Sequence, residues 1–78
     1  MSDSSQKIAI LTGGSSGIGR CAARSLADKG VKVYELSRRD VPAEGITHIY
    51  ADVSDEASVA AAVETVISNE GRIDILVN

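Results

Sequence analysis

The chain has 78 residues, and its 8 Lys and Arg against 11 Asp and Glu give a formal net charge of −3. This mildly acidic balance excludes a general electrostatic attraction to nucleic acids or to anionic membranes. One cysteine and one histidine exclude an intrachain disulfide and a Cys/His zinc site. No apolar run approaches the ~20 residues of a membrane helix, and no secretory leader opens the chain. We therefore expect a cytoplasmic protein.

The first apolar run predicts a strand at Lys7–Thr12 that is buried on both faces. Four consecutive apolar residues, Ile8–Leu11, form it, as is typical of a strand in a parallel sheet. The preceding residues are mostly polar, so we expect residues 1–6 to form a flexible tail and residues 7–78 to form the N-terminal part of a single domain.

A glycine-rich loop, Gly13–Gly19, follows this strand and leads into a predicted helix at Ile18–Lys29. Apolar residues recur four apart along one helical face, at Ile18, Ala22 and Leu26. Gly30 lies where a helix commonly ends in a left-handed residue.

Two further strands are predicted at Val31–Leu36 and Ile46–Ala51, with a short connection between them. A second helix then runs to about Asn69, capped by Ser54 or Asp55. Its expected buried stripe consists of Val59, Val63, Val66 and Ile67. A fourth strand is predicted at Arg72–Asn78.

Strands that alternate with helices predict an α/β fold with a parallel sheet and right-handed crossovers. We expect a Rossmann-like doubly wound sheet, truncated after the fourth strand, with strand order 3-2-1-4. The strand at Arg72–Asn78 would then lie at one edge of the sheet.

The glycine loop between strand and helix predicts a phosphate-binding site. Missing side chains let an anion approach the backbone, and a helix N-terminus offers free N–H groups and a positive dipole. A Walker P-loop is excluded because Arg20 and Cys21 occupy the positions of its lysine and its magnesium-binding hydroxyl. The pattern present is T-G-x-x-x-G-x-G, on Thr12, Gly13, Gly17 and Gly19.

With this loop, the chain resembles the classical short-chain dehydrogenases/reductases. Asp52 and Val53 match the family's adenine-contacting pair, and Asp74–Asn78 matches the start of its D-x-L-V-N-N-A-G segment. The resemblance implies an oxidoreductase that transfers hydride between a nicotinamide cofactor and a carbonyl or alcohol substrate. The family's catalytic Ser and Tyr-x-x-x-Lys are absent, since Arg38 stands four residues after Tyr34 and Ser54 four residues after Tyr50. No catalytic residue is therefore assigned.

The end of the second strand indicates which cofactor is bound. In dinucleotide folds an acid about 20 residues after the loop binds the ribose of NAD, whereas arginine accommodates the 2′-phosphate of NADP. Ser37 stands twenty residues after Gly17, and Arg38 and Arg39 follow it. Because serine can donate to phosphate and guanidinium can grip it with two bonds, we predict NADP(H) rather than NAD(H). The alternative for these residues is a solvated charged turn.

Some of the remaining assignments keep an alternative. Thr12 either stabilises the glycine turn or simply ends its strand, and Asp52 either holds the adenine amino group or caps the next helix. Asn78 could brace the sheet beside the cofactor. The complete predicted cofactor-binding set is Thr12, Gly13, Ser15, Ser16, Gly17, Ile18, Gly19, Ser37, Arg38, Arg39, Asp52, Val53 and Asn78, with no metal ligand.

Three functions compete for this chain. It is the cofactor-binding part of an NADPH-dependent reductase with a small carbonyl or alcohol substrate, a half module that binds only the adenosine side of a nucleotide, or a non-catalytic fragment that associates with another chain. We expect the 78 residues alone to be inactive and to self-associate, with neither nucleic acid nor membrane as a partner.

Overall fold

The computed structural model describes residues 6–12, 17–38 and 45–77. The described elements alternate between strand and helix, as the sequence predicts. They are β1 (Ile8–Thr12), α1 (Gly17–Asp28), β2 (Lys32–Ser37), β3 (Ile46–Tyr50), α2 (Glu56–Glu70) and β4 (Ile75–Val77).

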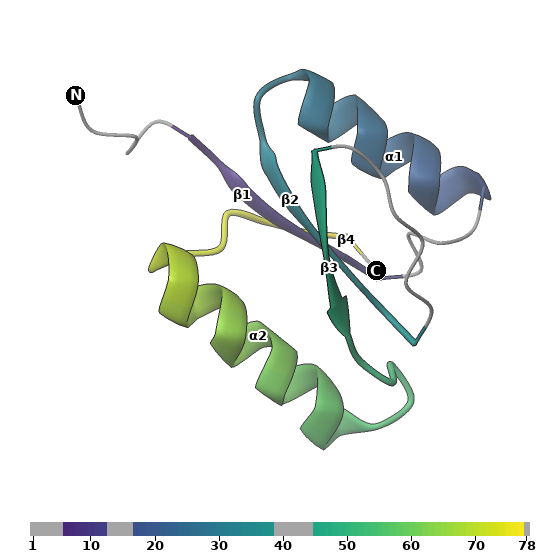
Figure 1. Cartoon of the computed structure of the whole chain (residues 1–78), viewed down its shortest axis with the longest axis vertical. Helices are drawn as coiled ribbons and strands as arrows, with labels where there is room; N and C mark the ends of the chain where they lie inside the picture. The colour runs from purple at the N-terminus through teal and green to yellow at the C-terminus, as the bar shows by residue number, and fades with distance from the viewer. Residues whose placement is uncertain (1–5, 13–16, 39–44, 78) are drawn as a thin grey trace.

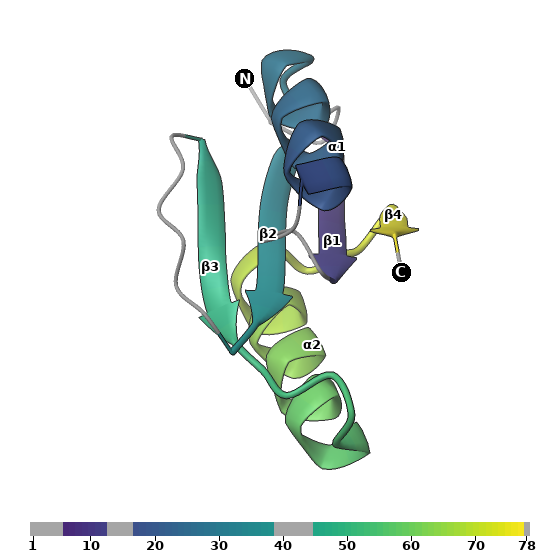
Figure 2. The ribbon, with the colours of Figure 1, turned by 90° about the vertical axis from the view of Figure 1, so that its right-hand side faces the viewer.

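The strands form one parallel sheet in the order β3-β2-β1-β4, which confirms the predicted topology. Figure 2 shows this order across the sheet, with β3 and β4 at its two edges. The order reverses beside β1, because the chain first moves outward through β2 and β3 and then returns to the other side of β1.

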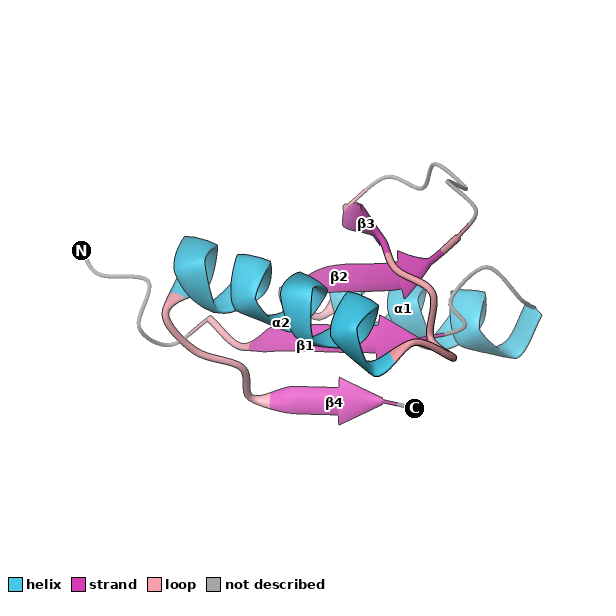
Figure 3. Cartoon of the chain, turned by 90° about the horizontal axis from the view of Figure 1, so that it is seen from below, coloured by secondary structure: helices cyan, strands magenta, loops and turns pink. Residues whose placement is uncertain are grey.

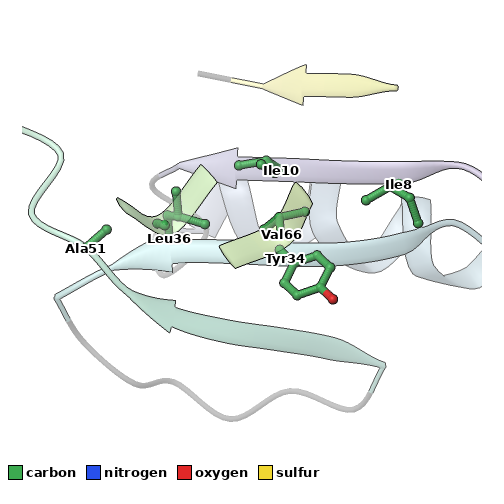
Figure 4. Close-up of a cluster of buried hydrophobic side chains, with 7 residues drawn as sticks. Ile8, Ile10, Tyr34, Leu36, Ala51 and Val66 are labelled. Atoms are coloured by element: carbon green, nitrogen blue, oxygen red, sulfur yellow. The ribbon is translucent and has the colours of Figure 1, made fainter. Parts of the chain in front are cut away.

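The helices cover opposite faces of the sheet, α1 one face and α2 the other (Figure 1). Each face carries its own apolar cluster, because successive side chains of a strand point to opposite sides. The cluster under α2 consists of Ile8, Ile10, Tyr34, Leu36, Ala51, Ala62 and Val66 (Figure 4). The cluster under α1 consists of Ala9, Leu11, Ala23 and Val33. The expectation that β1 is buried on both faces is therefore confirmed.

The ends of α2 are set by two capping residues. Asp55 is the N-cap, and its side chain accepts a hydrogen bond of 3.0 Å from the Ala57 amide. Gly71 ends the helix in the left-handed conformation (φ 80°) and donates its N–H to the Ile67 carbonyl. Glycine suits this position because it has no Cβ to clash there.

The buried face of α2 differs from the predicted stripe at two residues, Ala62 and Ile67. Val66 and Ala62 are buried against the sheet, whereas Ile67 is 44% exposed. In Figure 3, α2 crosses β1 and β2, while β4 lies at the edge of the sheet. The prediction that Ile67 belongs to the core is therefore wrong, because consecutive residues of a helix are about 100° apart and Val66 is the one that faces the sheet.

An ion pair and a hydrogen bond connect the C-terminal end of α2 to β2. Glu70 Oε2 lies 2.7 Å from Lys32 Nζ and accepts a hydrogen bond from the Tyr34 hydroxyl. Lys32, and then Tyr34, hold the pKa of Glu70 below its usual range. The same contact with Glu70 raises the pKa of Lys32.

The segment before β4 joins this strand to β1 and replaces part of the predicted strand. Asp74 Oδ2 accepts a hydrogen bond of 2.9 Å from the Ile8 amide, and the Asp74 amide donates to the Ile8 carbonyl. Arg72 holds the Asp74 carboxylate, with Nη2 2.6 Å from Oδ1. Strand β4 is thus shorter than the predicted Arg72–Asn78, and its Leu76 is 69% exposed.

Among the residues that the structure describes, no helix is long and apolar enough to cross a membrane.

Candidate functional site

The four strands are parallel, so their carboxyl ends lie at the same end of the sheet. In open α/β sheets, ligands bind in the crevice outside these ends, where the strand order reverses. Here the reversal lies beside β1, which ends at Thr12 and pairs with β2 and β4. Those predicted cofactor-binding residues that the structure describes lie at or close to this end of the sheet.

Helix α1 begins at Gly17, and Gly19 lies in its first turn. The free N–H groups and the positive dipole of this helix end make it suited to an anion. Gly13, Ser15 and Ser16 of the predicted phosphate loop lie outside the described residues, as do Arg39 and Asn78. Ile18 belongs to the first turn of the helix.

The structure brings the turn after β2 close to the turn after β3. The Ala51 amide donates to the Ser37 carbonyl at 3.0 Å, so the two strand ends are joined by a hydrogen bond. Hydrogen bonds from Ser54, together with the more distant positive charge of Arg38, hold the pKa of Asp52 below its usual range. Ser37, Arg38 and Asp52 therefore lie near one another at the carboxyl end of the sheet, although they lie on separate segments of the sequence.

Asp52 is not the cap of α2, because Asp55 has that role. One Asp52 oxygen, Oδ1, accepts hydrogen bonds from the Ser54 amide at 3.0 Å and from its hydroxyl at 2.7 Å. The Asp52 amide in turn donates to the Ser58 hydroxyl. These bonds fix the turn that leads into α2.

A hollow of about 370 Å³ connects this turn to the end of β1. It is lined by Thr12, Val53, Glu56, Val59 and Ala60. Val53 is 56% exposed, so its side chain is accessible from this hollow. Thr12 and Val53, two predicted cofactor residues, thus line one common surface.

Sequence reasoning considered Tyr50 only as a catalytic tyrosine and did not place it beside Ser37. It is 65% exposed, and its Cα lies opposite that of Ser37 in the β2–β3 register. The signal in the sequence was an aromatic residue two positions before Asp52. Without the register, however, nothing linked this residue to the end of β2.

A larger hollow, of about 510 Å³, lies at the other end of the strands. Gly30, Lys32 and Ile46 are among its lining residues, and they lie at or before the amino ends of β2 and β3. This position is opposite the crevice in which parallel sheets bind ligands. Within the described ranges, no three His, Cys, Asp or Glu residues gather closely enough to hold a metal ion.

The model of one protein family, described as short chain dehydrogenase, matches residues 7–78. Among curated proteins, a 3-ketodihydrosphingosine reductase of Bacteroides thetaiotaomicron is 41% identical over 75 residues. The match covers 92% of this chain and 27% of that protein.

Two solved structures show the same arrangement of elements. A C-terminal deletion mutant of aldohexose dehydrogenase from Thermoplasma acidophilum is 38% identical with a TM-score of 0.90, and the match covers 94% of this chain and 32% of that one. A 3-ketoacyl-(acyl-carrier-protein) reductase from Brucella melitensis, complexed with NADH, is 37% identical with a TM-score of 0.80; the coverage is 90% and 32%. The chain thus spans about a third or less of the length of these relatives.

Proposed function

Because the chain belongs to the short-chain dehydrogenase family of oxidoreductases, we propose that it is the NADP(H)-binding part of such an enzyme. The enzyme transfers hydride between the nicotinamide and a small carbonyl or alcohol compound in the cytoplasm. A nicotinamide cofactor fits the family, and one solved relative is complexed with NADH. The preference for NADP(H) is inferred from this chain's own residues.

The observation that carries this proposal is the position of Arg38. Its cation follows the last residue of β2 and acts on Asp52 at the end of β3. Ser37, the residue at the ribose position, is neutral, so no carboxylate there repels a 2′-phosphate. A neutral hydroxyl followed by a guanidinium suits that phosphate.

The other described residues have complementary roles in the proposal. The N-terminus of α1 and the glycine loop receive the diphosphate, with Gly17 leaving room for it and Gly19 allowing α1 to pack closely on the strand. Asp52 holds the adenine amino group, and Val53 contacts the ring from the hollow that it shares with Thr12. Arg39, the loop residues Gly13, Ser15 and Ser16, and Asn78 complete the predicted set.

We also propose that these 78 residues have no reductase activity by themselves. Neither tyrosine is followed by the lysine of the family's Tyr-x-x-x-Lys motif. The described site residues lie at the end of the sheet proposed for the adenosine and the diphosphate, and none of them is assigned as the proton donor. Self-association through the edge of the sheet is the alternative role of the chain in isolation.

The test of the cofactor assignment is Arg38→Ala in the protein expressed from its whole reading frame. We expect NADPH binding to weaken by about 1.5–3 kcal/mol, the range for a hydrogen bond to a charged group, with NADH binding nearly unchanged. Calorimetric titration with both cofactors measures the difference. An equal loss for the two cofactors would overturn the assignment.

A further inference from the structure

The last residues of β2 and β3 form a pair on the face of the sheet that α1 covers. In the β2–β3 register the Cα of Val33 lies opposite that of Ile46; Val33 belongs to the cluster under α1, and Ile46 packs against that cluster. Alternate residues of a strand share a face. Ser37 and Tyr50, the last pair of this register, therefore lie on the same face.

Tyr50 is exposed, whereas the pair before it is enclosed in the sheet. Glu35 is only 4% exposed, and its Oε1 lies 2.8 Å from Nδ1 of His48, its Cα partner on β3. Tyr50 is the next residue of β3 on the same face and is 65% exposed. The close packing under α1 thus ends between these two pairs, and the Tyr50 side chain is accessible at the carboxyl end of the sheet.

The sheet holds Tyr50 beside the proposed ribose position. Neighbouring strands lie about 4.8 Å apart, and the hydrogen bond of 3.0 Å from the Ala51 amide to the Ser37 carbonyl joins the two strand ends. Ser37 stands where dinucleotide folds bind the adenosine ribose, and the exposed Arg38 follows it. A tyrosine hydroxyl, which carries an O–H donor, is therefore placed one strand away from the residues proposed to hold the 2′-phosphate.

The face on which Tyr50 lies favours a contact with the ribose side over one with the adenine ring. Val53, the proposed adenine contact, lines a hollow that it shares with Glu56 and Val59 of α2. Tyr50 lies on the face under α1, on the other side of the sheet from α2. A ligand group that contacts Tyr50 must therefore extend from the ribose toward the α1 side, where the Ser37 side chain lies.

We propose that Tyr50 is a specificity residue for the 2′-phosphate of the cofactor, its hydroxyl donating a hydrogen bond to a phosphate oxygen beside Ser37 and Arg38. A hydrogen bond to a charged acceptor is stronger than one to a neutral group. Without the phosphate, the ribose presents only a neutral hydroxyl at this point. Tyr50 therefore adds to the affinity for NADP(H) and contributes little to that for NAD(H). This proposal rests on the function proposed above and deepens it.

The test compares adenosine 2′,5′-bisphosphate with 5′-AMP, two probes that differ only in the 2′-phosphate, on the protein expressed from its whole reading frame. Tyr50→Phe removes the hydroxyl and keeps the ring. We expect its affinity for the bisphosphate to fall about tenfold, the lower end for a hydrogen bond to a charged group, and its affinity for 5′-AMP to stay unchanged. Calorimetric titration measures both.

Thr47→Val is the matched control, because it removes another exposed hydroxyl from β3 with little change in volume. Thr47 lies near the amino end of β3, away from the proposed site, so this variant should change neither affinity. The melting temperatures of both variants should stay close to that of the wild type, since both side chains are exposed. A lower melting temperature in Tyr50→Phe alone, with equal losses for the two probes, would show a structural role and overturn the inference.

The outcomes separate this inference from the function proposed above. If the wild type prefers the bisphosphate and Tyr50→Phe keeps that preference, the inference is wrong and the cofactor assignment stands. If the wild type binds both probes equally, the NADP(H) preference is wrong and the inference falls with it. If Arg38→Ala weakens both probes equally while Tyr50→Phe selectively loses the bisphosphate, Tyr50 recognises the phosphate and the role assigned to Arg38 is wrong.

Discussion

Asp52 has a structural role in the turn before α2 and a proposed role in binding adenine. Its Oδ1 accepts two hydrogen bonds from Ser54 and so shapes the turn into α2. We propose that its other oxygen accepts a hydrogen bond from the adenine amino group. One residue can serve both purposes because a carboxylate has about four lone-pair positions.

Asp52→Asn separates these duties. The asparagine oxygen can still accept from Ser54, but its amide group donates and cannot accept from adenine. We expect 5′-AMP affinity to fall about tenfold, the lower end for a hydrogen bond to a charged group, while the melting temperature stays close to that of the wild type. Asp52→Ala should lower both. Unchanged binding in Asp52→Asn would show that Asp52 only shapes the turn.

Some residues near the proposed site could be predicted from the sequence, whereas others could not. Arg38 was predicted as a site residue from its spacing of about 20 residues from the glycine loop, and Asp52 from its match to the family's adenine-contacting pair. The contact between Glu35 and His48 could not be predicted, because it depends on the β2–β3 register. A one-residue shift would place His48 on the opposite face of the sheet.

At the scale of the elements, the two adjacent aliphatic residues of α2 differ in burial. Val66 is fully buried between α2 and the sheet (Figure 4), and Ile67 is 44% exposed. Val66→Ala should destabilise the protein by about 1–3 kcal/mol through the lost methyl contacts and the cavity left behind. Ile67→Ala is the matched control, since both changes replace a β-branched residue by a better helix former.

Urea denaturation of the two variants measures this difference. We expect Ile67→Ala to remain within ~0.5 kcal/mol of the wild type, as exposed substitutions commonly do. Equal losses in the two variants would mean that another part of the protein covers Ile67.

The link between β1 and β4 should be sensitive to acid. Hydrogen bonds from Arg72, and then from the Ile8 amide, hold the pKa of Asp74 below its usual range. A carboxyl with a lowered pKa in the folded state stabilises the protein above its unfolded pKa of about 3.9, and this contribution is lost as the pH falls through the folded value.

Asp74→Asn tests this dependence, because asparagine does not titrate. We expect the variant to have a lower urea midpoint than the wild type at pH 7, and the two midpoints to converge between about pH 4 and pH 2. Glu70 also has a lowered pKa, but it is present in both proteins and its effect cancels. A midpoint difference that persists unchanged to pH 2 would contradict the ionic role of Asp74.

The elements were predictable where local pattern and tertiary burial agree. The run Ile8–Leu11 is apolar throughout because β1 lies between two helices and two strands, and it formed the predicted strand. The hydrophobic pattern gave wrong predictions for the burial of Ile67 in α2 and for the start of β4, because both depend on which other elements pack against them. Ile67 looked like a core residue from its spacing alone, and Arg72 and Asp74 bind each other and β1 instead of extending β4.

Considered as a whole, the molecule has two unequal sheet edges. The β3 edge is the longer of the two and carries the exposed polar residue Thr47, with the exposed Tyr50 at its carboxyl end. The β4 edge carries Leu76, which is 69% exposed, and Ile67 is exposed on α2. Unpaired N–H and C=O groups beside exposed apolar side chains favour pairing with another chain. We therefore expect these 78 residues to associate through β4.

Leu76→Lys tests this expectation, because a charge at an edge strand opposes pairing. In sedimentation equilibrium at micromolar concentration, we expect the 78-residue chain to be dimeric or larger and Leu76→Lys to shift it toward the monomer. Thr47→Lys places the same charge on the β3 edge and should leave the association unchanged. An NADPH oxidation assay on a panel of carbonyl compounds should show no turnover with any of the three chains. A monomeric wild-type chain would rule out the β4 edge as an interface, and turnover would show that catalysis needs no further residues.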